Sequence, residues 1–158
     1  MASILFLHGL EGSPTGRKAN WLRQHYDAVA PALDTQTFEQ AVADGAKALE
    51  AFRPALVIGS SYGGAVLLEL ACSGRWAGPS IFLAQAGKKL LPYDRLPPGH
   101  QAVFIHGTLD ELIPWQESAE LVEATGPSAR LVLVEDEHRL NSVLGSVLAE
   151  AIHSLLPE

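Results

Sequence analysis

The hydrophobic pattern divides the chain into short apolar runs separated by amphipathic segments. Six runs are predicted to be strands, namely 3–7, 28–30, 55–59, 80–84, 102–106 and 130–134. Most of them are continuously apolar rather than alternating, which is typical of strands buried on both faces of a parallel sheet. The run at 28–30 is the shortest, and Pro31 ends it. The pattern therefore predicts a six-stranded, mostly parallel sheet.

Segments with a helical period lie between most of these runs. In 37–52, apolar residues recur with a period near that of a helix, and Thr37 and Gln40 have the spacing of a capping box. Further helices are predicted at 17–26, 62–74, 115–126 and 141–156, the last with Asn141 as its N-cap. The alternation of strands and helices indicates an α/β fold with right-handed crossovers and helices on both faces of the sheet.

The length of the chain and one irregular segment limit its domain organisation. With 158 residues, the chain is predicted to form a single domain that spans 1–158. The stretch 85–101 contains prolines and scattered charges, and we expect it to be an irregular excursion on the surface. It is too short to form a separate cap domain over a binding site.

Charge and composition exclude several classes of function. The net charge of −7 and the isoelectric point near 5.3 argue against a nucleic-acid partner and disfavour strongly anionic substrates. The single cysteine, Cys72, excludes an internal disulfide and a cysteine-rich zinc site, and we interpret it as an apolar filler on its helix. Neither a signal peptide nor a run of about 20 apolar residues is present. We therefore expect a cytoplasmic protein that does not bind membranes; its oligomeric state stays open.

The stretch LVIGSSYGG at 56–64 places two serines between small residues at the end of a predicted strand. A serine exposed on a sharp turn from strand to helix needs small residues two positions before and two after it. Gly59 and Gly63 meet this requirement around Ser61, whereas Ser60 would have Ile58 and Tyr62 there. Ser61 is therefore the candidate nucleophile. The motif alone is also compatible with a purely structural turn.

A base and an acid for Ser61 are expected after later strands, because open α/β sheets bind ligands at the carboxyl ends of their strands. His138 follows the last strand and is the candidate base. Asp110 follows the fifth strand and is the preferred acid; Glu111 is the alternative, and Asp136 is too close to His138 in sequence.

The other histidines are assigned less direct roles. His8 and His106 precede glycines at strand ends, where an imidazole can bind loop backbone and shape the site. The remaining three are expected at the surface: His25, His100 and His153.

The oxyanion of an acyl-transfer reaction needs two backbone N–H donors. Tyr62, directly after the candidate nucleophile, and Leu10, in the loop after the first strand, are the predicted donors. Gly9 and Gly12 allow this loop to approach the serine. Glu11 would repel an oxyanion, so we expect its side chain to face solvent.

These motifs, FLHGLEGSP, GSSYGG, HGTLDELIP and EDEHRL, span nearly the whole chain. Together they resemble the α/β-hydrolase superfamily of serine hydrolases, most closely its small, lidless bacterial esterases of the YqiA type. The resemblance implies a minimal α/β-hydrolase fold with strand order 2-1-3-4-5-6. It also implies ester hydrolysis through an acyl-enzyme, with Ser61 as nucleophile, His138 as base and Asp110 as orienting acid.

The predicted function is therefore hydrolysis of carboxylic esters, or of thioesters, with small and uncharged or weakly charged acyl groups. No cofactor and no metal ion is expected. Possible substrate contacts include His8, Gly9, Tyr62, Leu91 and Tyr93. The alternative is a binding or regulatory protein that has the fold without turnover. It is disfavoured because the chain contains a candidate for each of the three catalytic residues.

Overall fold

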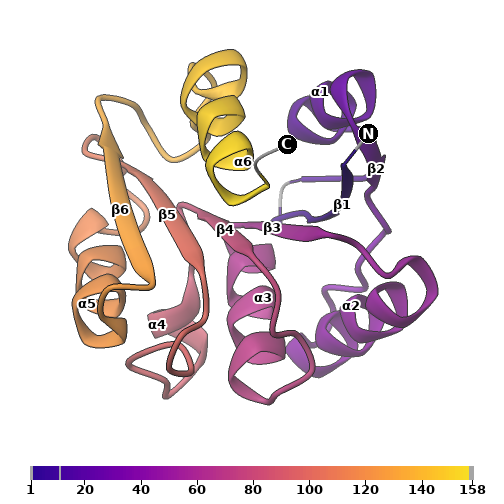
Figure 1. The fold of residues 1–158 in the computed structure, drawn as a ribbon, viewed down its shortest axis with the longest axis horizontal. Coiled ribbons are helices and arrows are strands. Elements are labelled where there is room, and N and C mark those ends of the chain that lie inside the picture. Colours follow the sequence, from indigo (N-terminus) through magenta and orange to yellow (C-terminus); the bar gives the residue numbers. More distant parts are fainter. Residues whose placement is uncertain (1, 11, 157–158) are drawn as a thin grey trace.

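The structure is a computed structural model that describes residues 2–10 and 12–156. Its centre is a sheet of six parallel strands in the order β2-β1-β3-β4-β5-β6, which confirms the predicted order. The strands are β1 (Ser3–Leu7), β2 (Asp27–Val29), β3 (Leu56–Ser60), β4 (Ser80–Leu83), β5 (Ala102–Gly107) and β6 (Ala129–Val134). The strand that precedes the candidate nucleophile Ser61, β3, therefore lies in the interior of the sheet, between β1 and β4 (Figure 1).

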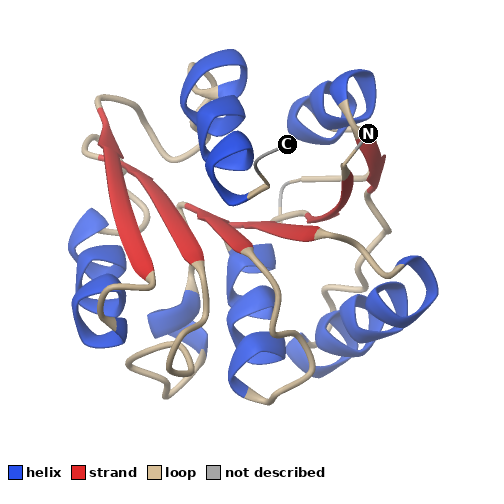
Figure 2. Ribbon diagram, viewed as in Figure 1, coloured by secondary structure: helices blue, strands red, loops and turns tan. Residues whose placement is uncertain are grey.

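Helices cover both faces of this sheet, as the alternating pattern predicts (Figure 2). One face is covered by α1 (Arg17–His25) and α6 (Ala149–Leu155), the latter preceded by one π-helical turn, η1 (Leu144–Leu148). The opposite face carries α2 (Phe38–Phe52), α3 (Tyr62–Cys72), α4 (Gly87–Leu90) and α5 (Trp115–Thr125). The fold is thus a three-layer sandwich, which explains why the strands are apolar on both sides.

The two hydrophobic cores follow the period of two along the strands. In β1, Ile4 and Phe6 belong to the core under α1 and α6, whereas Leu5 and Leu7 belong to the core under α2 and α3. In the second core, Phe82 stacks on Phe104 of the neighbouring strand with ring centroids 4.4 Å apart. These buried side chains hold the carboxyl ends of the strands at one common edge.

Two predicted helix starts have different outcomes. Thr37 caps α2, because its Oγ1 accepts a hydrogen bond from the Gln40 N–H at 3.0 Å, although the Gln40 side chain donates to Asp44 instead of completing the capping box. Asn141 as the N-cap of the last helix is wrong. The chain turns at Leu140, which has a φ of 51°, and the helical segment begins only at Leu144.

The prediction of an irregular surface excursion at 85–101 is wrong in part. The segment contains the short helix α4, and its residues Gln85, Leu96 and His100 are buried. His100, expected at the surface, lies 2.8 Å from the Ser80 Oγ through its Nε2. Leu96 therefore belongs to the core on the α2 and α3 side of the sheet, whereas residues 88–90, 94–95 and 98–99 are exposed as predicted.

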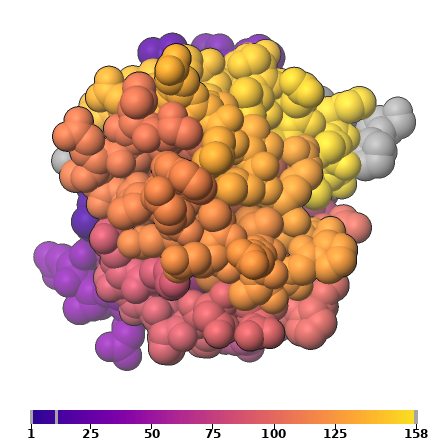
Figure 3. Space-filling model, turned by 90° about the vertical axis from the view of Figure 1, so that its left-hand side faces the viewer, coloured from indigo at the N-terminus to yellow at the C-terminus, as the bar shows by residue number. Residues whose placement is uncertain are grey.

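The strands at the two edges of the sheet are β2 and β6, and β6 has exposed side chains. Figure 3 looks onto the β6 edge, where the orange segment that includes α5 and β6 covers the middle of the face. Arg130 and Leu133 of β6 are exposed, and a charged side chain on an edge strand disfavours pairing with another sheet.

In the described part of the chain, no helix has the length and apolarity that crossing a membrane requires.

Three backbone segments approach one another closely where β3 turns into α3. A Cβ atom added to Gly59 would lie 2.5 Å from the Gly63 carbonyl oxygen, and one added to Gly63 would lie 2.0 Å from the Leu7 carbonyl oxygen. Both contacts are to backbone, which cannot rotate away. The glycines at these positions are therefore required by sterics, as the sequence pattern around Ser61 predicts.

We expect Gly63→Ala to lower the free energy of unfolding by about 3 kcal/mol or more, because the strand end and the helix would have to move apart. The matched control is Gly145→Ala in η1, where an added Cβ meets no atom within 4 Å. That variant should be neutral or more stable by up to about 1 kcal/mol. Urea unfolding of both variants measures the difference, and equal stability would contradict the steric account.

Candidate active site

Ser61 lies on a strained turn between β3 and α3. Its φ of 55° and ψ of −114° are uncommon for a residue with a side chain, and such strain is typical of functional sites. The segment after β4 holds this turn: the Ser61 N–H donates to the Leu83 carbonyl at 2.8 Å, and the Ala86 N–H donates to the Ser61 carbonyl at 3.0 Å. The conformation is therefore imposed by hydrogen bonds from outside the turn.

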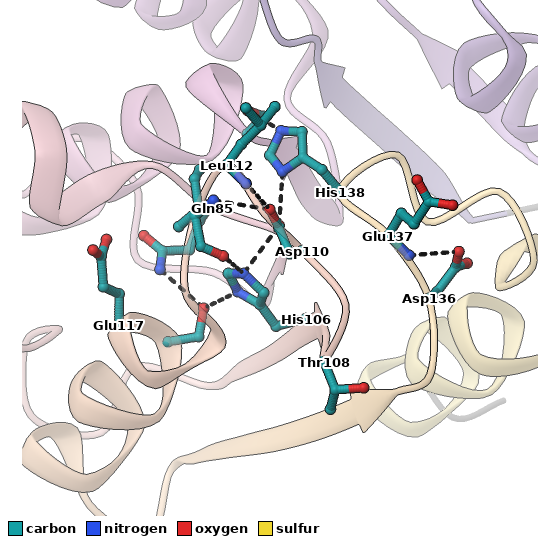
Figure 4. Close-up of polar contacts among 12 residues, drawn as sticks. Gln85, His106, Thr108, Asp110, Leu112, Glu117, Asp136, Glu137 and His138 are labelled. Carbon is teal, nitrogen blue, oxygen red and sulfur yellow. Dashed lines mark hydrogen bonds and ion pairs between the residues drawn. The ribbon is translucent and has the colours of Figure 1, made fainter.

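Ser61, His138 and Asp110 are joined by hydrogen bonds, although each comes from a different strand end. The Ser61 Oγ lies 2.9 Å from the His138 Nε2, and the His138 Nδ1 lies 2.7 Å from the Asp110 Oδ2 (Figure 4 shows the latter contact). Because a carboxylate accepts hydrogen bonds, the His138 Nδ1 carries the hydrogen, and its Nε2 is left to accept the Ser61 hydroxyl proton. A serine with this environment can be deprotonated as it attacks.

The Asp110 carboxylate is buried and fully held by donors. Its side chain has no exposed surface, whereas that of His138 is 19% exposed. The Oδ1 accepts backbone N–H groups of Leu112 at 2.9 Å and Ile113 at 2.8 Å. Glu111, the alternative acid, is exposed. The structure thus brings Asp110 to His138 and leaves Glu111 in solvent.

The loops that carry Asp110 and His138 are joined to each other by backbone contacts. The Leu109 N–H donates to the Asp136 carbonyl at 3.1 Å, and a Cβ on Gly107 would lie 2.1 Å from the same oxygen. The Asp136 carboxylate accepts from the Glu137 N–H and from both the N–H and the hydroxyl of Ser142. These bonds lower the pKa of Asp136, the Ser142 hydroxyl contributing most. The Asp136 carboxylate therefore holds the loop that carries His138, and in the hydrogen bonds described above, its partners are Glu137 and Ser142 rather than the His138 ring.

The remaining histidines occupy distinct environments. His8 is buried and accepts the Leu33 N–H on its Nε2 at 3.0 Å, so its Nδ1–H donates to the Gly9 carbonyl at 2.7 Å. His8 thus joins the loop after β1 to the segment after β2. His25 and His153 are exposed, as predicted.

A second serine–histidine pair, Ser80 with His100, lies at the start of β4 and β5, away from the carboxyl ends of the strands. Both residues are buried, and Trp76 also donates to the Ser80 Oγ at 3.0 Å. Burial lowers the pKa of His100. The pair is enclosed by protein and lacks the cavity that adjoins Ser61.

A cavity of about 420 Å³ adjoins Ser61. Its walls come from the loop after β1, the start of α1 and the loop after β6, and they include His8, Gly9, Leu10 and His138. A Cβ on Gly9 would lie 3.2 Å from the Ser61 Cβ, so the first loop lies directly against the serine. The predicted oxyanion donors, the Leu10 and Tyr62 N–H groups, thus belong to two segments next to Ser61, the loop after β1 and the start of α3. Glu11 lies outside the described residues.

The predicted substrate contacts do not all meet in this cavity. His8 and Gly9 line it. The Tyr62 ring instead packs edge-on against Phe38 with centroids 5.6 Å apart, on the α2 side of the sheet. Leu91 packs against the same core, and the Tyr93 hydroxyl donates to Glu69 at 3.0 Å. Tyr62, Leu91 and Tyr93 are therefore absent from the described residues that line the cavity.

Sequence reasoning missed the cations beside Ser61. Arg17, Lys18 and Arg139 line the cavity, and none of its other described lining residues is acidic. The Lys18 ammonium donates to the Arg139 carbonyl at 2.6 Å, and burial, followed by the nearby charge of Arg139, lowers the pKa of Lys18. Their positions in the sequence could have indicated this, because Arg139 directly follows His138 and Arg17 is the first residue of the helix after the predicted oxyanion loop.

Two further observations concern the Cys72 thiol and groups of side chains that could bind a metal ion. Burial and the charge of Glu69 raise the pKa of Cys72 to about 11, so this thiol is protonated at neutral pH, in agreement with its interpretation as a filler. Within residues 2–10 and 12–156, no group of three or more histidine, cysteine or acidic side chains is arranged to hold a metal ion.

Comparisons with known proteins address the fold. Neither the protein-family models nor the curated proteins give a match. The chain is similar to a solved protein of the α/β-hydrolase superfamily from Xanthomonas campestris pv. campestris, with TM-score 0.80 and 22% identity over 98% of this chain and 96% of that one. It is also similar to alpha/beta hydrolase domain-containing protein 10 from mouse (TM-score 0.80, 17% identity, 97% and 88% covered). A third is the esterase domain of a Rhodothermus marinus protein (TM-score 0.69, 20% identity, 97% and 84% covered). The chain therefore has the α/β-hydrolase fold, and its described residues include no cap domain.

Proposed function

We propose that this protein is a serine hydrolase that cleaves carboxylic esters through an acyl-enzyme. The observation that carries the proposal is the pair of hydrogen bonds from Ser61 to His138 and from His138 to Asp110, next to an open cavity. Within the fold, we place the protein with the small, lidless bacterial esterases of the YqiA type, on the motifs around Gly9, Ser61 and Asp110. Thioesters have the same acyl carbonyl and are the second substrate class.

In the proposed reaction, the Ser61 Oγ attacks the acyl carbon while its proton passes to the His138 Nε2. Asp110 holds the imidazole through its Nδ1–H and stabilises the positive charge that forms on it. The protonated His138 then gives its proton to the leaving alcohol, and the acyl group stays on Ser61. Water attacks the acyl-enzyme in the same manner and releases the acid.

The negative oxygen of the tetrahedral intermediate would be stabilised by the N–H groups of Tyr62 and Leu10. Tyr62 is the first residue of α3, so its N–H has no acceptor within the helix and points out of the helix start, where the helix dipole favours negative charge. Gly9 lies against Ser61, and its neighbour Leu10 lines the cavity that adjoins this serine, which supports Leu10 as the second donor. Two donors from separate segments are what acyl transfer requires.

The charge of the substrate depends on the cavity more than on the net charge. The net charge of −7 disfavours strongly anionic substrates, because it repels anions at long range. Arg17, Lys18 and Arg139 line the cavity itself, and salt screens more distant charges beyond about 8 Å at physiological ionic strength. Among the uncharged or weakly charged acyl groups predicted, we therefore include those that carry one negative charge.

Labelling with a fluorophosphonate probe tests the nucleophile. The wild-type protein should be labelled, and Ser61→Ala should lose all labelling because the reactive oxygen is gone. Ser60→Ala is the matched control, since it removes a hydroxyl from the neighbouring residue, and it should keep most labelling and activity. Equal labelling of wild type and Ser61→Ala, or none of either, would favour the alternative of a binding protein without turnover.

A matched pair of p-nitrophenyl esters tests the role of charge. We expect Arg17→Gln to lower kcat/KM for the mono-succinate ester by roughly three- to tenfold, and to leave the neutral butyrate ester nearly unchanged, since one nearby charge contributes about 1 kcal/mol. Lys47→Gln removes the same charge from α2, away from the cavity, and serves as the control. An equal effect of the two variants would show that only the net charge matters.

A further inference from the structure

A chain of buried polar side chains lies behind Asp110, on the side away from solvent. Gln85, His106 and Ser118 have no exposed surface, and they come from the end of β4, the end of β5 and the first turns of α5. The His106 Nε2 lies 3.2 Å from the Asp110 Oδ2, the same oxygen that accepts the hydrogen bond of His138 (Figure 4). The chain therefore reaches the proposed acid.

The hydrogen atoms in this chain can be placed from the partners alone. The hydrogen bond of the His106 Nε2 is to the Ile113 carbonyl at 2.8 Å, whereas its contact with the Asp110 Oδ2 is longer, at 3.2 Å. Because both neighbours are acceptors, this nitrogen carries the hydrogen. Burial lowers the pKa of His106, so its ring is neutral and its Nδ1 is an acceptor. The Nδ1 must then accept the Ser118 hydroxyl, which is 2.7 Å away.

The same reasoning extends to the far end of the chain. The Ser118 Oγ donates to His106 and therefore accepts from the Gln85 Nε2 at 2.9 Å, while the Gln85 Oε1 accepts the Gly87 N–H at 2.7 Å. Gln85, Ser118 and His106 are thus joined end to end by hydrogen bonds whose donors point toward Asp110. Buried hydrogen bonds of this kind favour a single arrangement of the side chains that they join.

This series of hydrogen-bonded side chains begins at Gln85, in the segment that also binds the proposed nucleophile Ser61. Leu83 and Ala86, on either side of Gln85, bind the Ser61 N–H and carbonyl. A Cβ on Gly64 would lie 2.7 Å from the Gln85 Cβ, so α3 packs directly on this residue. One short segment after β4 therefore sets the position of Ser61 through its backbone and that of Asp110 through the side chain of Gln85.

We propose that His106 is a positioning residue that fixes the Asp110 Oδ2 for its hydrogen bond to His138, and that Ser118 and Gln85 hold His106 in the required tautomer and orientation. The inference rests on the proposed function, because Asp110 is the orienting acid there. It goes beyond the three catalytic residues, since His106 is not among the described residues that line the cavity.

Two amide substitutions separate this role from packing. The Gln amide nitrogen is the same number of bonds from the backbone as the histidine Nε2, so His106→Gln can still place an N–H donor beside the Ile113 carbonyl and the Asp110 carboxylate. His106→Asn reaches only as far as the Nδ1 position, which faces Ser118. We expect His106→Asn to lower kcat for a p-nitrophenyl ester by roughly ten- to a hundredfold with little change in KM, and His106→Gln to recover most of that loss.

The hydrogen bond between His138 and Asp110 can also be observed directly, by a measurement that does not depend on turnover. The His138 Nδ1–H bound to a carboxylate should give a low-field imidazole resonance in the proton NMR spectrum, assigned by its absence in His138→Gln. We expect His106→Asn to shift this resonance upfield or abolish it, and His106→Gln to retain it. The matched controls are His100→Asn and His100→Gln, which alter a buried histidine at the other end of β5 and should leave the resonance and kcat unchanged.

The outcomes distinguish the two proposals. If His106→Asn keeps the wild-type kcat and resonance, or if both His106 variants and the His100 variants lose them equally, the positioning role is wrong. If the wild-type protein hydrolyses no ester and takes no fluorophosphonate label, the proposed function fails, while the resonance still reports whether His106 holds the Asp110–His138 bond.

Discussion

The positive φ of Ser61 is the constraint on which the rest of the site depends. A residue with a side chain adopts this conformation only when its surroundings impose it, and here the backbone after β4 binds both the N–H and the carbonyl of Ser61. The turn can close because Gly59 and Gly63 lie in backbone contact with α3 and β1. The same geometry starts α3 directly after Ser61, so a helix N-terminus faces the point where the proposed oxyanion forms.

The parallel sheet then places the other groups within reach. Asp110 and His138 follow β5 and β6, which pair along their whole length, and the loops after these strands bind each other through the Asp136 carbonyl. Because the loops that carry Asp110 and His138 contact each other directly, no additional domain is needed to hold these two residues together. The cavity next to this site is lined in part by the start of α1, where Arg17 and Lys18 contribute positive charge.

Much of the fold could be predicted from the sequence, because its strands are continuous apolar runs and the turn around Ser61 has a strict steric requirement. The strand order came from the resemblance of four motifs to a known superfamily and is confirmed. The candidate residues Ser61, Asp110 and His138 could be named because each follows a strand, and the structure joins them by hydrogen bonds.

Other features depend on contacts that no local pattern encodes. The start of the last helix is delayed to Leu144 by the turn at Leu140, and α4 has only four residues between polar and proline-rich neighbours. The burial of His100, and the chain from Gln85 through Ser118 to His106, arise from side chains of distant segments that meet only in the folded protein. The gathering of Arg17, Lys18 and Arg139 at the cavity has the same origin, so the net charge of the chain does not reveal it.

The central claim is that the acyl group of an ester is transferred to the Ser61 Oγ. The direct measurement is to quench the protein in acid during turnover of a p-nitrophenyl ester and to locate the acyl group by tandem mass spectrometry of the peptide that contains LVIGSSYGG. Our account predicts one acyl group per chain, on Ser61. Turnover accompanied by an acyl group on Ser60 or on another residue, or by no acylated peptide under any quench time, would contradict it.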